Sequence, residues 1–507
     1  MKPFSSPKIS KLLKKINIKL VFWVIFCLLF LAWAFTQFYR LSQTFYLYHD
    51  FAQYAFKMFD WRSSGEIPLL GPFVTYVNFY LPPTYYWIIY PFYLITNGSI
   101  FYNHLACFVY TWVIFLGLAL ALYKRPTYRW SFLFLIALFC LNPLIIVNRT
   151  HQVWNPSYIW QPVVVAWYCL ALSTQSKRRL LLCVIGGAAC AVVIGMELLI
   201  IPVVIGLLIV SALRLRGKVL PWLISFSVAS SICWLPVLAV QFNQILNTSL
   251  VLPNQPADLF AVRFYKLFAT AFAPTIYSYN HINLNPHVIV LYVILLAVVI
   301  FYLKKNWGIK MLRQDWFQVL LVLTITAIIS LIPKIEMSFW YTTGLAAIII
   351  LLLVNLPGRL KYLISTLLTI YWLTFFFKSA NIIASAPSIE SCLKQICQRV
   401  TPYQYYYVSY ADDITSGNAL AYFLTTAGCP PVQRWRMFDL DQPEDSINTD
   451  YQLLAAHYLD TSQHSNPLYI EHESFLNEFY SHPIASASCD GNWGWTLYDK
   501  VHQDEIN

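Results

Sequence analysis

Apolar runs of membrane-spanning length alternate with short polar segments over the first 380 residues of the chain. A helix needs about 20 mostly apolar residues to cross a bilayer, so each of these runs is a candidate transmembrane helix. The eleven runs lie near residues 20–38, 104–123, 128–148, 157–174, 181–196, 198–213, 219–241, 287–303, 316–333, 337–356 and 359–380. The pattern predicts an α-helical polytopic membrane protein with about 11–13 transmembrane helices.

One more apolar stretch, residues 84–97, is only about 14 residues long. It is bounded by Pro82-Pro83 on one side and by Asn97-Gly98 on the other. This length favours a re-entrant or interfacial helix over a full crossing. A full crossing would require one of the other runs to be re-entrant, because it would change the side on which every later loop lies.

Short basic clusters between the apolar runs predict how the chain is oriented. Six lysines precede the first run, which is too long for a signal peptide and has no small-residue cleavage site after it. By the positive-inside rule the N-terminus is therefore cytoplasmic, and eleven crossings place residues 381–507 on the periplasmic or extracellular side of the inner or plasma membrane. The other basic clusters then all face the cytoplasm, and they lie at 124–125, 177–179, 214–218, 304–313 and 359–361.

Composition and charge agree with this reading. Of the 507 residues 58% are apolar and 11% charged, against about a quarter charged in soluble domains, which excludes an ordinary soluble enzyme. The net charge of +11 divides into +22 for residues 1–380 and −11 for residues 381–507. Because the bases lie in short clusters next to apolar runs, they indicate contact with membrane lipids and no nucleic acid partner.

The tail, residues 381–507, has the pattern of a small soluble α/β domain. Alternating residues predict strands near 404–411, 435–440, 451–459, 468–472 and 493–498, and a helical run spans 419–426. Seven of the 11 cysteines lie in apolar runs, where a free cysteine behaves as a small hydrophobe. The other four, Cys392, Cys397, Cys429 and Cys489, suggest two disulfides with three possible pairings, and four free thiols are the alternative.

Carboxylates are scarce in the membrane region, so they mark the places where catalysis can occur. Three sizeable regions face outward, at 39–83, 242–286 and 381–507. Residues 1–380 hold seven acids: Asp50, Asp60, Glu66, Asp258 and Glu336 on outward loops, Glu197 at an outward turn, and Asp315 on the cytoplasmic side. Asp50 lies in an aromatic, interfacial stretch, where it is suited to act as a general base toward a hydroxyl acceptor. The alternative is that Asp50 caps the helix that follows it.

The first outward loop also resembles a known family. Asp50 is followed by the run GEIPLLGP (65–72) and then by LPPTYYW (81–87). Together with a WNPS turn (154–157) and a GME turn (195–197), these segments are similar to class C (GT-C) membrane glycosyltransferases of the protein O-mannosyltransferase and aminoarabinose-transferase group. The resemblance covers roughly residues 15–380.

The resemblance implies transfer of a sugar from a polyprenyl-phosphate donor to an acceptor on the outer face, with inversion at the sugar, as in cell-envelope enzymes. Asp50 would then be the catalytic base or would position the acceptor. Members of the family often carry a second acid shortly afterwards, but here Phe51 follows, and the need for a divalent metal stays open. Glu66 is a possible substitute for that second acid. The acceptor is a lipid, a glycan or a protein.

Departure of the carrier phosphate requires cations near the leaving group. Arg263 and Lys266, three residues apart in the second long loop, are the leading candidates, and Tyr279 and His281 can hydrogen-bond a sugar or phosphate there. Further candidates for the donor phosphate or the acceptor are Lys57, Glu66, Arg149, His151 and Glu197. For each base the alternative is snorkelling to lipid headgroups.

Two other classes of function compete with glycosyl transfer. A transporter or flippase with an accessory outer domain would carry ionisable residues near the membrane midplane and internal repeats, and neither is evident. A ligase or polymerase of lipid-linked glycans would depend on outer-loop Arg and His more than on an Asp. Gly-rich phosphate loops, GxSxG elbows and HExxH pairs do not occur, so nucleotide-binding, serine-hydrolase and zinc-peptidase functions have no support.

Overall fold

The computed structural model describes a helical bundle and a small sheet. The described residues are 17–38, 49–74, 79–99, 101–142, 145–146, 153–247, 293, 296–297, 300–304, 309–331, 343–379, 405–409, 433–434, 452–458, 483–489 and 493–498. All structural statements below concern these residues.

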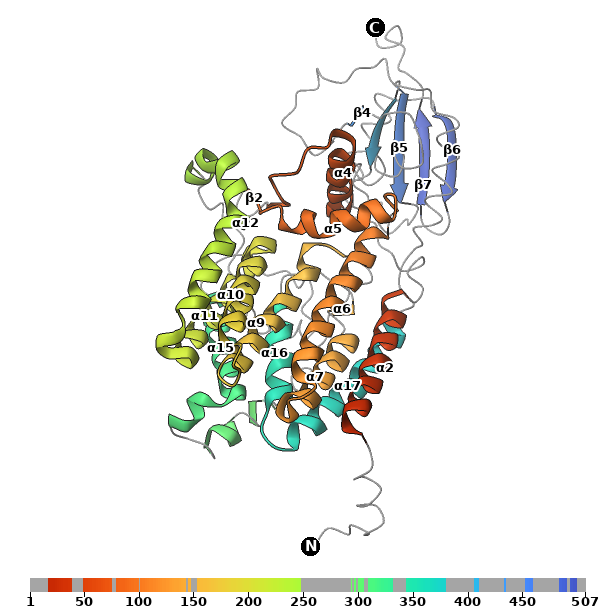
Figure 1. Ribbon diagram of the computed structural model, residues 1–507. Coiled ribbons are helices and arrows are strands. Elements are labelled where there is room, and N and C mark those ends of the chain that lie inside the picture. The colour runs from red at the N-terminus through yellow and green to blue at the C-terminus, as the bar shows by residue number, and fades with distance from the viewer. Residues whose placement is uncertain are drawn as a thin grey trace.

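Most of the bundle consists of helices that run up and down along one common direction (Figure 1). Five segments are long and apolar enough to cross a membrane, so the prediction of a mostly helical, multi-pass membrane protein is confirmed, whereas the count of 11–13 spans stays a prediction. The five segments are Ile18–Phe38, Tyr102–Leu122, Arg179–Met196, Leu198–Lys218 and Leu220–Phe242. The helices are α2 (Ile18–Phe38), α6 (Tyr102–Leu122), α7 (Pro126–Leu141), α9 (Trp160–Ser173), α10 (Arg179–Met196), α11 (Ile201–Leu215), α12 (Leu220–Asn247), α15 (Asp315–Leu331), α16 (Thr343–Asn355) and α17 (Leu360–Ser379).

Helix α9 lies in the interior of the bundle. All of its 14 residues are buried except Val165. On its neighbour α10, Gly186 and Gly187 allow α12 to approach closely, because a Cβ atom at either position would lie 2.3 Å from an atom of Trp222. By contrast, only five of the 21 residues of α2 are buried, so this helix lies at the periphery of the bundle.

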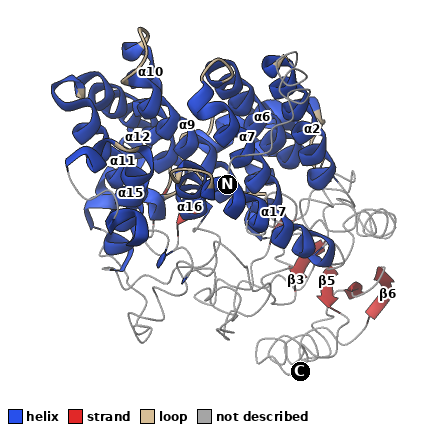
Figure 2. Cartoon of the chain, turned by 90° about the horizontal axis from the view of Figure 1, so that it is seen from below, coloured by secondary structure: helices blue, strands red, loops and turns tan. Residues whose placement is uncertain are grey.

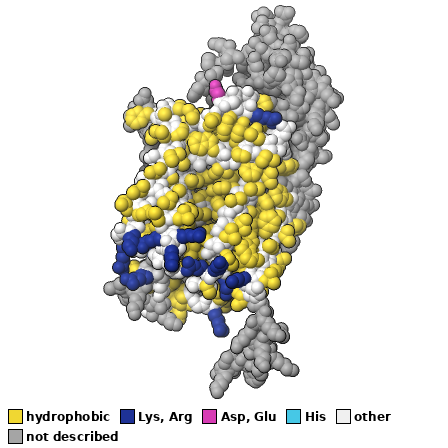
Figure 3. Space-filling model, viewed as in Figure 1, with side chains coloured by type: hydrophobic (Ala, Val, Ile, Leu, Met, Phe, Trp, Pro, Cys, Tyr) yellow, Lys and Arg dark blue, Asp and Glu magenta, His cyan; other side chains and the backbone are white. Residues whose placement is uncertain are grey.

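Basic residues collect at one end of the bundle, which we call the lower end (Figure 3). The turns between α6 and α7, α9 and α10, α11 and α12, and α16 and α17 all lie there (Figure 1). These turns carry Lys124, Arg125, Lys177, Arg178, Arg216, Lys218 and Arg359. An apolar band covers the visible surface above them (Figure 3). The positive-inside rule expects basic residues in the cytoplasmic turns of a membrane protein, and this end has them. The assignment of this end to the cytoplasm stays a prediction.

Two short helices, α4 (His49–Ser64) and α5 (Thr84–Ile95), lie at the opposite, upper end (Figure 1). Helix α5 follows Pro82-Pro83 and has 12 residues, a length of about 18 Å at 1.5 Å per residue, which is too short to cross a hydrocarbon layer of about 30 Å. It ends at Ile95, and the turn that follows contains Asn97 and Gly98, whose φ angles of 53° and 76° are left-handed.

A short hairpin joins α4 to α5 and rests on α12. Its strands β1 (Phe73–Val74) and β2 (Phe79–Tyr80) are antiparallel, with Phe73 opposite Tyr80. The backbone N–H of Tyr80 donates to Oε1 of Gln241 at 3.1 Å, at the point where α12 is kinked. At the base of the hairpin a Cβ on Gly71 would lie 2.1 Å from the carbonyl oxygen of Pro82, so this close approach requires glycine.

The described part of the tail is a five-stranded sheet in the order β4-β3-β5-β7-β6. Its strands are β3 (Tyr405–Ser409), β4 (Gln433–Arg434), β5 (Gln452–Tyr458), β6 (Pro483–Cys489) and β7 (Trp493–Tyr498). Strand β3 is parallel to β4 and β5, while β7 is antiparallel to β5 and β6. Figure 2, which views the molecule from below, shows the strands beyond one edge of the helix array.

The strands expected near 404–411, 451–459 and 493–498 correspond to β3, β5 and β7. The α/β class expected for the tail is not supported, because every element that the structure describes there is a strand. A parallel pair such as β3 and β5 requires a crossover connection of a dozen or more residues. The predicted helix at 419–426 and the predicted strands at 435–440 and 468–472 lie outside the described residues.

Candidate functional site

Helix α4 carries the predicted base. Asp50 is the second residue of α4, so it lies in the first helical turn, where the helix dipole favours a carboxylate. The structure describes the backbone of Asp50, and its side chain lies outside the described part. Tyr54 follows one turn later, and residues four apart share a face of a helix. The contacts of Tyr54 therefore show how the N-terminal half of α4, which includes Asp50, is held in the molecule.

Tyr54 is buried, with 4% of its surface exposed, against α5 and the centre of the molecule. Its ring packs edge-on against Tyr85 and Tyr86, at centroid distances of 5.1 and 5.8 Å. Its hydroxyl donates a hydrogen bond of 3.1 Å to Oδ1 of Asn155 in the WNPS turn. The helix that carries Asp50 thus packs directly on two of the segments that carry the family resemblance.

The WNPS turn also meets the GME turn. Asn155 begins a short 3₁₀ helix, η1 (Asn155–Tyr158), and its Nδ2 donates to the carbonyl oxygen of Met196 at 2.8 Å and to Oε2 of Glu197 at 3.3 Å. The other oxygen of Glu197, Oε1, accepts from the backbone N–H of Leu199 at 3.3 Å, at the start of η2 (Leu198–Ile200). Only 2% of Glu197 is exposed, so its carboxyl group lies inside the protein, where its described contacts include the Asn155 amide and the Leu199 N–H.

A second set of hydrogen bonds fixes α5 and α6 around the same turn. Nδ2 of Asn103 donates to the hydroxyl of Tyr85 at 2.6 Å and to the carbonyl oxygen of Val153 at 2.5 Å. The hydroxyl of Tyr158 donates to Oδ1 of Asn103 at 2.6 Å. Asn103 and Tyr158 are completely buried. Tyr54, Tyr85, Asn103, Asn155, Tyr158 and Glu197 together form what we call the upper polar cluster.

Two further candidates on the first loop, Lys57 and Glu66, are exposed. Lys57 comes seven residues after Asp50, so helical periodicity places both on the same side of α4. Glu66 follows Gly65, where α4 has ended, and its backbone N–H donates to Oγ of Ser64 at 3.1 Å. Neither side chain has a described contact with the upper polar cluster.

Comparison with known proteins identifies the fold. No protein-family model matches the sequence, and no curated protein sequence matches it. The crystal structure of ArnT from Cupriavidus metallidurans in the apo state matches with a TM-score of 0.58 and 12% sequence identity, covering 93% of this chain and 97% of that chain. The chain has the fold of ArnT. A structure of the same protein bound to undecaprenyl phosphate matches with a TM-score of 0.47 and 12% identity over 95% of this chain, which is too low to add to this conclusion.

The ArnT fold agrees with the resemblance to the aminoarabinose-transferase group in the first loop. At 12% identity the agreement concerns the fold, and the roles of individual residues stay predictions. Several of those residues lie outside the described part of the chain, namely Arg149, His151, Arg263, Lys266, Tyr279, His281, Cys392, Cys397 and Cys429. Cys489 is described through its backbone alone, as the last residue of β6.

Metal binding and cysteine pairing can be examined within the described residues. Among them, no group of three or more His, Cys, Asp or Glu side chains is placed to hold a metal ion. The seven cysteines of the apolar runs form no disulfide with one another, as expected of cysteines that act as small hydrophobes.

The sequence did not single out Tyr54, Asn103 or Tyr158. Asn103 carried a usable signal, because a polar residue at the start of an apolar run must find partners inside the protein. Tyr54 lies one turn after the suspected base, but it belongs to an aromatic stretch that is equally typical of the membrane interface. Their hydrogen-bond partners are 18 to 101 residues away in the chain, so local patterns do not reveal them.

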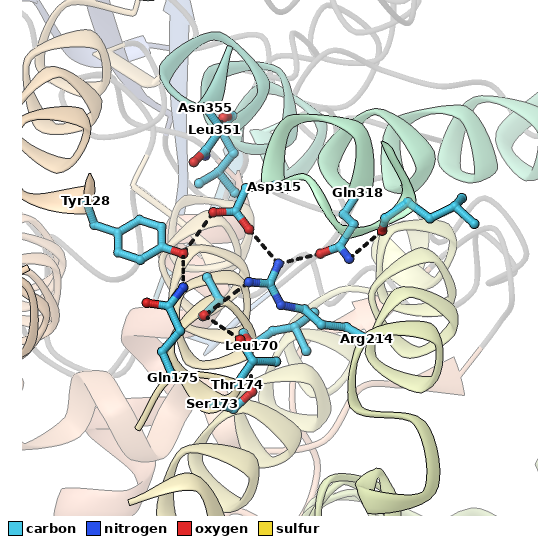
Figure 4. A network of polar contacts seen from close by, with 12 residues as sticks. Tyr128, Leu170, Ser173, Thr174, Gln175, Arg214, Asp315, Gln318, Leu351 and Asn355 are labelled. Carbon is cyan, nitrogen blue, oxygen red and sulfur yellow. Dashed lines mark hydrogen bonds and ion pairs between the residues drawn. The ribbon is translucent and has the colours of Figure 1, made fainter. Parts of the chain in front are cut away.

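A different polar cluster lies near the lower end of the bundle (Figure 4). Nη1 of Arg214, near the end of α11, forms an ion pair of 2.6 Å with Oδ1 of Asp315, the first residue of α15. Arg214 also donates to Oε1 of Gln318 and to the carbonyl oxygen of Ala171. The hydroxyl of Tyr128 donates to Oδ2 of Asp315 at 2.9 Å. These residues, with Gln175, form the lower polar cluster, which joins α7, the α9 end, α11 and α15.

Proposed function

We propose that the chain is a membrane glycosyltransferase that transfers a sugar from a polyprenyl-phosphate-linked donor to a lipid, glycan or protein acceptor on the outer side of the membrane. The main support is the ArnT fold over 93% of the chain, together with the packing of the Asp50-bearing helix against the PPTYY and WNPS segments. ArnT itself has been solved with undecaprenyl phosphate bound, a carrier of the class that the sequence resemblance implies.

In this proposal Asp50 takes a proton from the acceptor hydroxyl. The acceptor oxygen attacks the anomeric carbon from the side opposite the phosphate, and the bond between that carbon and the phosphate oxygen breaks. The carrier phosphate leaves with the bonding electrons, and the sugar configuration is inverted. Arg263 and Lys266 would stabilise the negative charge that develops on the phosphate. Lys57, Arg149 and His151 are further groups for binding the donor or the acceptor.

The basic turns at the lower end support the orientation that this reaction needs. With that end in the cytoplasm, α4, α5 and the upper polar cluster face the periplasm or the exterior, and so does the tail domain. Four cysteines of that domain, Cys392, Cys397, Cys429 and Cys489, would then meet an oxidising compartment in which two disulfides are stable.

The test is sugar transfer by the purified full-length protein in nanodiscs, with a panel of polyprenyl-phosphate sugars and with release of the polyprenyl phosphate as the readout. We expect Asp50→Asn to lower the rate by about 10²- to 10⁴-fold, the usual contribution of a general base. Asp60→Asn is the matched control, because Asp60 is an exposed carboxylate on the same helix. Full activity in a correctly inserted Asp50→Asn protein would exclude Asp50 as the base. Absence of transfer by the wild-type protein from every donor would overturn the proposed function.

A further inference from the structure

We infer that Glu197 is a positioning residue that acts on the base-bearing helix through Asn155 and Tyr54. The inference rests on the proposed function, because it gives a purpose to the placement of α4. In this inference the buried Glu197 of the GME turn holds the first turns of α4 in place and does not contact the substrate.

The first step is the orientation of the Asn155 side chain. Its two amide hydrogens are both used, one on the carbonyl oxygen of Met196 at 2.8 Å and one on Oε2 of Glu197 at 3.3 Å. A flipped amide would place the Asn155 oxygen against these two acceptors, and like partial charges would repel. The carbonyl of Met196 and the carboxyl group of Glu197 therefore act together to direct Oδ1 of Asn155 to Tyr54.

The second step is the rigidity of Glu197 itself. It ends α10 with an extended backbone, and its Oε1 accepts the N–H of Leu199. Removal of a carboxylate from water is costly, so a Glu that is 98% buried is expected to keep every hydrogen bond that it makes. Both carboxyl oxygens of Glu197 make a described hydrogen bond, so the group is fixed at two points.

The third step links Tyr54 to Asp50. The Tyr54 hydroxyl is bound to Asn155 and the ring is enclosed by Tyr85 and Tyr86. The described contacts of the other half of α4 go to α5 and the turn after it, where Trp61 stacks on Tyr90 at 3.6 Å and Arg62 donates to Asn97 at 2.7 Å. The Tyr54 bond therefore ties the Asp50 half of α4 to the WNPS and GME turns. A shift of about 1 Å in a reacting group can cost 10²-fold in rate.

The decisive variants change one group at a time. Tyr54→Phe keeps the ring and removes the hydroxyl. Glu197→Leu removes both carboxylate oxygens, whereas Glu197→Gln keeps one acceptor oxygen for Asn155. Tyr90→Phe is the matched control, because it makes the same chemical change in a ring that packs on α4 outside the upper polar cluster.

We expect Tyr54→Phe and Glu197→Leu each to lower kcat by about 10- to 100-fold, with the donor KM within about twofold of wild type. The double variant should be little worse than the poorer single variant, because both changes break one chain of contacts. Glu197→Gln should restore most of the activity lost in Glu197→Leu, and Tyr90→Phe should behave as wild type. A raised KM with unchanged kcat would instead place Glu197 at the donor and overturn the inference.

Hydrogen exchange of the α4 amides gives a readout that does not require activity. We expect faster exchange over residues 49–56 in Tyr54→Phe and Glu197→Leu, and no change in Tyr90→Phe. Unchanged exchange and unchanged kcat in Tyr54→Phe, which removes a single oxygen atom, would overturn the inference whether or not Glu197→Leu inserts. If the inference is overturned in this way while Asp50→Asn is inactive, the proposed function still stands. If the wild-type protein shows no transfer, hydrogen exchange still tests the inference, because it does not depend on activity.

Discussion

The upper and lower polar clusters differ in the contacts that the structure describes for their carboxyl groups. In the lower cluster a cation and an anion meet directly, with Arg214 and Asp315 only 2.6 Å apart and their side chains 8% and 21% exposed. In the upper cluster the buried Glu197 carboxylate is held by an amide and a backbone N–H, and the described contacts extend outward through neutral groups to α4. A direct ion pair fastens helices together. A carboxyl group that is 2% exposed is costly to bury, so we infer that Glu197 is retained because its hydrogen bonds place other groups.

The largest effect should come from breaking the lower ion pair. Arg214→Leu leaves Asp315 without its cation and should destabilise the protein by about 3 kcal/mol, the lower end of the range for buried pairs because Asp315 is partly exposed. A thermal-unfolding series in detergent measures this loss. The rate of transfer per folded molecule should not change, and a fall in that rate would mean that the lower cluster has a role in the reaction.

The next largest effect should fall on activity. Asn155→Leu removes the centre of the upper cluster, so it should lower kcat by about 10²-fold. Its thermal stability should fall by about 1–3 kcal/mol, because the partners of Asn155 lose their hydrogen bonds. Steady-state kinetics beside thermal unfolding separate the two effects. Loss of stability with an unchanged kcat would mean that the upper cluster, like the lower one, stabilises the fold without a role in the reaction.

Replacement of both charged partners sharpens the comparison. The double variant Arg214→Leu/Asp315→Leu should recover most of the stability lost in Arg214→Leu and unfold within about 1.5 kcal/mol of wild type, because no unpaired charge remains. The same thermal-unfolding measurement applies. A double variant as unstable as the single one would show that the hydrogen bonds around the pair, and not the pair itself, fasten the helices.

The smallest effect is expected at the edge of the lower cluster. Tyr128→Phe removes one hydrogen bond to Asp315 and should cost about 1 kcal/mol, with transfer unchanged. Chemical denaturation in mixed micelles can resolve a difference of this size. A cost as large as that of Arg214→Leu would make Tyr128 an equal partner of the ion pair.

The sequence predicted the features that depend on local patterns. Hydropathy gave the helices, the alternation of residues gave β3, β5 and β7, and the basic clusters mark the turns of the lower end. It also indicated three of the segments that meet at the upper end. It could not show that they meet, because Tyr54 and Asn155 are 101 residues apart and Asn155 and Glu197 are 42 apart. Glu197 was a candidate for contact with substrate, and only the packing of helices shows how deeply it is enclosed.

Helix α9 has a consequence for the adaptation of the protein to its bilayer. Its 14 residues are about 21 Å long, roughly 9 Å less than the hydrocarbon layer, and a lipid-facing helix of that length would thin the bilayer or leave polar groups in contact with acyl chains. Because protein surrounds α9, the helix does not have to match the thickness of the hydrocarbon layer. The missing length is filled by η1, whose four residues are all buried. Because its residues are enclosed by protein, we expect the polar WNPS segment to be shielded from acyl chains in bilayers of different thickness.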